Sequence, residues 1–104
     1  GLAVAAAEMA FAGGFGAKIS LRQSPSDSTL DATALLFSES NTRFLCEVRP
    51  ENAEALEAAL AGLPLAKIGE VTDDGKLTIV DDASIVIESD LQTLKEAWQK
   101  PLRW

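Results

Sequence analysis

Residues 65–88 read LAKIGEVTDDGKLTIVDDASIVIE, and this stretch decides the fold that we expect. Apolar and polar residues alternate there in short segments, which predicts three β-strands: 65–71, 76–80 and 84–88. Thr72-Asp73-Asp74-Gly75 is a strong hairpin signal between the first two, because Asp-Gly favours a tight turn. Asp81-Asp82 then leads into the third strand.

Further predicted elements extend on both sides of this stretch. Before it, Pro50-Glu51-Asn52 opens a helix whose apolar residues recur at helical spacing from Ala53 to Leu63. After it, Leu91, Leu94 and Trp98 form one stripe of a closing helix, with Ser89 or Asp90 as its N-cap. The earlier predicted elements are a helix over 2–12, a strand over 17–22, a short apolar element over 32–37 and a strand over 44–48.

The first predicted helix is followed by Gly13-Gly14-Phe15-Gly16. We interpret these glycines as a C-terminal cap, because a phosphate-binding loop would precede a helix. The helix is almost wholly apolar, but Glu8 interrupts it, no basic segment precedes it, and it is shorter than the ~20 residues of a membrane span. The sequence opens within this helix, so we expect a domain truncated at its N-terminal side, although removal of a Met before Gly1 would look the same.

The order of predicted elements defines the expected fold class. A length of 104 residues suits a single domain over 1–104 with one core. Helix, strand, short helix, strand, helix, three strands and a helix describe an α/β (α+β) fold, in which a mixed β-sheet is flanked by helices.

Composition excludes several kinds of chemistry. The sequence has no His and one Cys, so histidine-assisted Ser or Cys nucleophiles and His-ligated or multi-Cys zinc sites are excluded. A net charge of −7 argues against nucleic acid and anionic membranes as partners. A single cysteine is also consistent with a reducing, cytoplasmic location.

Cys46 and two aspartate pairs have simple structural interpretations. Phe44, Cys46 and Val48 share one face of a predicted strand, so we expect Cys46 to be a buried small hydrophobic residue. Asp73-Asp74 and Asp81-Asp82 lack the ligand spacing of a calcium loop. We expect them to be turn carboxylates in solvent.

One polar cluster remains as a candidate ligand-binding site, and its candidate residues are Ser38, Glu39, Ser40 and Arg43. Hydroxyls and a guanidinium can bind a phosphate, and Glu39 could hold ribose hydroxyls or a metal-bound water. The alternative is a surface turn in which Arg43 pairs with Glu39 or with backbone carbonyls. The residue chemistry favours this turn, with at most weak anion binding.

A family resemblance covers nearly the whole sequence. It rests on ordered motifs: GLAVAAAEMAFAGG at 1–14, LFSES at 36–40 with RFL at 43–45, AKIGEV at 66–71, and LKEAW at 94–98 with Pro101-Leu102. These motifs resemble the last domain of the large, synthetase subunit of phosphoribosylformylglycinamidine synthase. That enzyme is a member of the aminoimidazole ribonucleotide synthetase superfamily, whose C-terminal domains contain a mixed sheet flanked by helices.

The resemblance implies a cytoplasmic ligase of purine biosynthesis. That family converts formylglycinamide ribonucleotide to its amidine with ATP, magnesium and ammonia from a glutaminase component. Its catalytic histidine and most ATP and magnesium ligands belong to nucleotide-binding domains that have no counterpart here, so no cofactor is expected in this chain. This domain type occurs twice, and the sequence resembles the second copy. Ser38, Glu39, Ser40 and Arg43 would therefore face a pseudo-symmetric, non-catalytic site.

Two functional interpretations follow from the resemblance. The first is a structural and interface domain, whose partners are the nucleotide-binding domains of the same polypeptide and the glutaminase component. Its first helix would present an apolar patch at Leu2, Val4 and Phe11. The alternative is a free-standing binding or regulatory module with the same fold and no catalysis.

Overall fold

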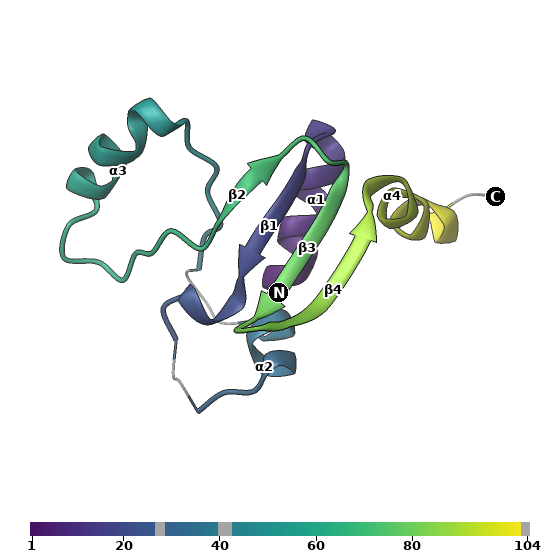
Figure 1. The fold of residues 1–104 in the computed structure, drawn as a ribbon, viewed down its shortest axis with the longest axis horizontal. Helices are drawn as coiled ribbons and strands as arrows, with labels where there is room; N and C mark the ends of the chain where they lie inside the picture. Colours follow the sequence, from purple (N-terminus) through teal and green to yellow (C-terminus); the bar gives the residue numbers. More distant parts are fainter. Residues whose placement is uncertain (27–28, 40–42, 103–104) are drawn as a thin grey trace.

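A computed structural model describes residues 1–26, 29–39 and 43–102, and contains a four-stranded mixed sheet (Figure 1). The strand order is β2-β1-β3-β4, in which β1 is antiparallel to β2 and parallel to β3, and β3 is antiparallel to β4. The strands are β1 (Gly16–Ser20), β2 (Gly69–Thr72), β3 (Lys76–Asp81) and β4 (Ser84–Asp90).

Helices cover one face of this sheet. The helices of the structure are α1 (Leu2–Gly13), α2 (Ala32–Phe37), α3 (Ala53–Ala59) and α4 (Leu91–Gln99), with short 3-10 turns η1 (Leu21–Gln23), η2 (Pro50–Asn52) and η3 (Lys100–Leu102), and of these α3 does not cover the sheet. Figure 1 shows α1 behind the strands, α2 near one end of the sheet and α4 beyond β4, whereas α3 stands apart. The predicted fold class, a mixed sheet flanked by helices, is confirmed.

The core lies between α1 and the sheet. Ala3 and Ala6 are buried in α1 and pack with Ile19 of β1 and with Leu77 and Ile79 of β3. Small alanine side chains let the helix approach the strands closely, which explains why an alanine-rich helix is used here. The alternating residues Lys18 and Thr78 point to the opposite face, where no helix packs among the described residues.

The predicted C-terminal end of α1 and N-terminal end of α4 are confirmed, whereas α3 ends at Ala59, before the predicted Leu63. Gly14 follows α1 with φ 78° and donates its N–H to Ala10 O, so the glycine cluster contains the expected C-cap. Asp90 is the N-cap of α4, because its carboxylate accepts the Thr93 N–H at 2.8 Å. Asp31 caps α2 in the same way through Ala34 N–H.

The expected hairpin at 72–75 is wrong in one respect. The chain does reverse there, but β1 lies between β2 and β3, so the two strands joined by this turn do not pair. The connection passes over the start of β1, where a Cβ on Gly16 would collide with Asp74 Oδ1, Lys76 O and Thr72 Oγ1. A local turn signal predicts a reversal of direction and not which strands become neighbours. A true antiparallel hairpin joins β3 to β4.

The predicted strand over 44–48 is also wrong. Residues 43–49 are described and form no strand, and Phe44 is 85% exposed. Cys46 is exposed, which corrects the expectation that it is buried. Alternation indicates that a segment can form a strand, but a strand also requires a neighbour, and this segment has none in the described part of the chain.

Candidate functional site

The predicted site at residues 38–43 is only partly visible. Ser38 ends α2 by donating its N–H to Ala34 O at 2.9 Å. Arg43 Nη1 donates a long hydrogen bond of 3.4 Å to Ser38 Oγ. Glu39 is exposed, and the ion pairs of the described residues do not include Glu39 with Arg43. Ser40 lies outside the described residues, so Ser38 and Arg43 are the only candidates that are seen together, and ligand binding remains a prediction.

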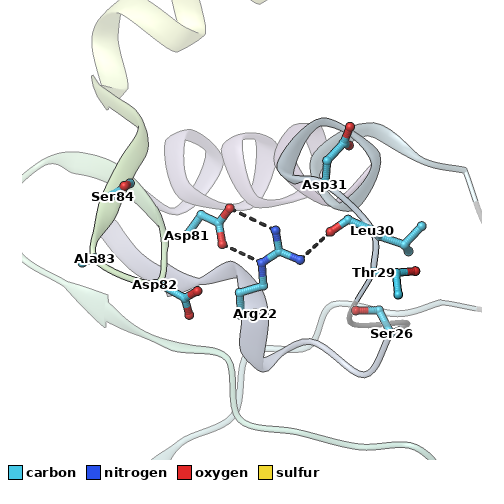
Figure 2. A pocket seen from close by; sticks show the side chains of 9 residues that line it. All are labelled: Arg22, Ser26, Thr29, Leu30, Asp31, Asp81, Asp82, Ala83 and Ser84. Carbon is cyan, nitrogen blue, oxygen red and sulfur yellow. Dashed lines mark hydrogen bonds and ion pairs between the residues drawn. The ribbon is translucent and has the colours of Figure 1, made fainter.

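A larger hollow lies elsewhere, between the segment after η1 and the β3–β4 turn (Figure 2). Its volume is about 830 Å³, and Arg22, Leu30, Asp31, Asp81 and Asp82 are among the residues that line it. No sequence pattern predicts this hollow, because its walls come from segments that are far apart in the chain, such as Arg22 and Asp81, which are 59 positions apart.

Arg22 lies at the centre of this hollow. Its Nε donates to Asp81 Oδ1 at 2.6 Å, its Nη2 donates to Asp81 Oδ2 at 3.1 Å, and its Nη1 donates to Leu30 O (Figure 2). This two-point fork is the geometry in which arginine binds carboxylates best. Arg22 therefore ties the segment before α2 to the end of β3.

Asp81 departs from the sequence prediction as a result. We expected a turn carboxylate in solvent, but the Asp81 side chain is 20% exposed and ion-paired. The hydrogen bond from Arg22 lowers the pKa of Asp81 below its ordinary value. Asp82, next in the chain, is exposed and adopts a positive φ of 52° in the turn, as a turn residue can.

The other aspartate pair behaves as expected. Asp74 accepts hydrogen bonds from Thr72 Oγ1 at 2.7 Å and from Lys76 N–H at 3.1 Å. The Thr72 hydrogen bond, followed by that from Lys76, lowers the pKa of Asp74. Asp73 and Asp74 are both exposed, so they are turn carboxylates in solvent, as predicted.

The Arg22 hollow is poorly suited to anions. The guanidinium is already bound through Nε and both terminal nitrogens, and Asp31, Asp81 and Asp82 place three carboxylates around it. Asp31 is also occupied by the α2 cap. Within the described residues, no three His, Cys, Asp or Glu side chains are grouped so that they could hold a metal ion. The arrangement serves to hold segments together.

A smaller hollow of about 350 Å³ lies on the uncovered face of the sheet, between β1 and β2. We call it the β1–β2 hollow, and it is lined by Lys18, Ser20, Lys67, Ile68, Glu70 and Val80. Lys67 Nζ lies 3.3 Å from Glu70 Oε1. Two lysines and one glutamate give this hollow a local positive balance in a chain whose net charge is −7.

The first helix presents less apolar surface than expected. Val4 is 51% exposed, but Leu2 is half-buried. Phe11 packs against Trp98 of α4, with ring centroids 5.5 Å apart. The predicted patch of Leu2, Val4 and Phe11 is therefore reduced to the side of α1 around Val4. No helix among the described residues is long and apolar enough to cross a membrane.

Known proteins resemble this chain over almost its whole length. Residues 1–82 match the family model described as AIR synthase related protein, C-terminal domain. Three similar proteins carry the name phosphoribosylformylglycinamidine synthase subunit PurL. The one from Deinococcus radiodurans is 40% identical over 104 residues, the one from Synechocystis sp. 45% over 103, and the one from Thermoplasma volcanium 37% over 106.

These alignments cover almost all of this chain but only a small part of each relative. They take in 99%, 95% and 97% of this chain, but 14%, 13% and 14% of the respective relatives. The chain thus spans about one seventh of the length of the curated relatives it matches. No solved structure is a significant match.

Proposed function

Because the chain belongs to the family of AIR synthase related protein C-terminal domains, we propose that it acts as the last domain of a phosphoribosylformylglycinamidine synthase. One observation carries this proposal: almost the whole chain aligns with about a seventh of proteins that bear that name. The enzyme would be an ATP-dependent ligase of purine biosynthesis that forms an amidine from formylglycinamide ribonucleotide. Its ammonia would come from glutamine through a glutaminase component.

Within such an enzyme, the proposed role of this domain is structural. The chain has no histidine, and the one arginine that lies in its larger hollow is fully engaged by Asp81 and Leu30. The nucleotide-binding domains of the same polypeptide would bind ATP and magnesium. Ser38, Glu39, Ser40 and Arg43 would lie at a pseudo-symmetric site that takes no part in turnover.

The proposed interface with a nucleotide-binding domain is the side of α1 around Val4. This side chain is 51% exposed on a helix whose opposite side is packed on the sheet. An exposed valine on a rigid helix can be buried against a partner at low entropic cost, since valine has few rotamers to lose.

A chimera tests the proposed function. The last domain of the Deinococcus radiodurans relative is replaced by this chain, and amidine formation is measured with ammonia as the nitrogen source. We expect activity to be retained, and Val4→Asp to reduce it by destabilising the interface. Ala12→Asp, on an exposed position of the same helix, is the matched control. A chimera that folds, as judged by its thermal melt, but has no activity would contradict the proposal.

A further inference from the structure

The segment that contains α3 stands apart from the rest of the molecule. We call residues 49–65 the arm; it comprises η2, α3 and the irregular chain on either side. Figure 1 shows α3 well to the side of the sheet, and none of its seven residues, all of which the structure describes, is buried. The arm contributes to a longest dimension of 47 Å against a shortest of 28 Å. The helix of the arm therefore does not pack on the sheet of its own chain.

The arm has the side chains of a helix that packs on a surface. Leu56 and Leu60 are four residues apart and so lie on the same side. Leu63 and Leu65 follow and are 63% and 41% exposed. The arm begins with Arg49 and then carries three glutamates, Glu51, Glu54 and Glu57, all of which are exposed, so its net charge is negative.

The β1–β2 hollow is complementary to this arm in charge and in polarity. Lys18 and Lys67 are exposed at its rim, and Ile68 and Val80 provide half-buried apolar surface within it. It lies on the face of the sheet that no helix covers among the described residues. An acidic helix with an apolar side is the kind of element that fits such a surface.

We propose that the β1–β2 hollow is a docking site for the arm of a second copy of this chain. Leu56 and Leu60 pack over Ile68 and Val80, while Glu54 and Glu57 lie near Lys18 and Lys67. Among the residues that the structure describes, none in the arm lines the β1–β2 hollow of its own chain, and Figure 1 shows α3 well to the side of the sheet, so the arm and the hollow of one copy can each contact a second copy. Reciprocal exchange of arms closes a two-fold dimer, which is a common route to self-association. This inference does not depend on the proposed function.

The first test is the mass of the 104-residue chain in solution, measured by light scattering over a range of concentrations. We expect a monomer–dimer equilibrium. Two variants reverse charge at the proposed contact: the first carries Lys18→Glu, and the second carries both Glu54→Lys and Glu57→Lys. Each variant should weaken the dimer roughly tenfold or more, because each places like charges in contact. The second variant should weaken the dimer even though it makes the net charge of the chain less negative and so reduces the general repulsion between two copies. Lys95→Glu, the same charge reversal at an exposed position of α4, is the matched control and should leave the dimer unchanged.

Mixing the two variants distinguishes exchange between copies from contact within one chain. The Lys18→Glu chain offers an acidic hollow and an acidic arm, whereas the double variant offers a basic arm and an unaltered basic hollow. Together they restore both complementary contacts, so the mixture should form a heterodimer with nearly the affinity of the parent. A parent chain that remains monomeric at all concentrations would overturn the proposal, as would a mixture that stays monomeric.

Discussion

Arg22 shows how a single residue joins parts of the chain that are distant in sequence. It binds Asp81, 59 positions away, and the carbonyl of Leu30. The sequence alternation around 17–22 identified a strand, but nothing in it identified this partner. Ion pairs across a fold arise from how the strands are arranged, so they become visible only when the strand order is known.

Stability should fall in acid, and Asp81 should contribute to that fall. Arg22 lowers the pKa of Asp81 in the folded state, below the ~3.9 of an unperturbed aspartate. The ion pair is therefore complete above about pH 4 and is lost as the pH falls through the lower folded value. Asp81→Asn should lower the melting temperature near neutral pH and make its decrease in acid shallower. Asp82→Asn, which lies outside the Arg22 fork, should keep the parent profile in the same series of melts.

Arg43→Ala should change the free energy of unfolding by only ~0–1 kcal/mol, because Arg43 is exposed and makes one long hydrogen bond. Thermal melts of the variant measure this. We also expect at most weak binding when the parent chain is titrated with phosphate and followed by NMR. A much larger loss of stability would mean that Arg43 is a structural residue, and tight phosphate binding would mean that the Ser38–Arg43 loop is a functional anion site.

Among the elements, β1 requires a glycine at its first residue, Gly16, because there is no space for a side chain there. Gly16→Ala should destabilise the fold by roughly 1–3 kcal/mol, because the new Cβ would collide with the backbone and side chains of the β2–β3 connection. Gly13→Ala is the control: it lies in α1 with open space around it, and should stabilise by about 0.4–1 kcal/mol. Denaturant unfolding compares the two. Equal effects would show that the connection does not press on Gly16.

Elements with a strong local signal were predictable from the sequence, and their pairing was not. The first helix, its glycine cap and the Asp90 cap were found because the groups that define them are close in sequence. The strand over 44–48 and the burial of Cys46 were wrong, because both assumed a neighbouring strand that the described residues do not supply. The candidate site at residues 38–43 was predictable only as a polar loop. Its geometry depends on how the loop packs against other parts of the chain, and a local run of polar residues does not indicate that.

At the scale of the whole molecule, the chain is a sheet with helices on one face and an arm to one side. The 104-residue chain should show no measurable affinity for Mg-ATP, because it has no histidine and its glycine cluster caps the C-terminus of α1 rather than the N-terminus of a helix. Calorimetric titration is the measurement. Saturable binding in the range of an enzyme substrate would contradict a purely structural role.

The separation of β2 from β3 by β1 also has a consequence for the order of events in folding. The contacts of the Asp73–Gly75 turn are local, so we expect the turn to form early, while β2 and β3 are still free to pair as an ordinary hairpin. In the native sheet those two strands must stand two strand spacings apart, about 9.5 Å, to admit β1 from more than 45 residues upstream. Such a hairpin would compete with the native sheet. Its two strands would have to separate before β1 entered, so we expect the turn that starts this half of the sheet also to delay its completion.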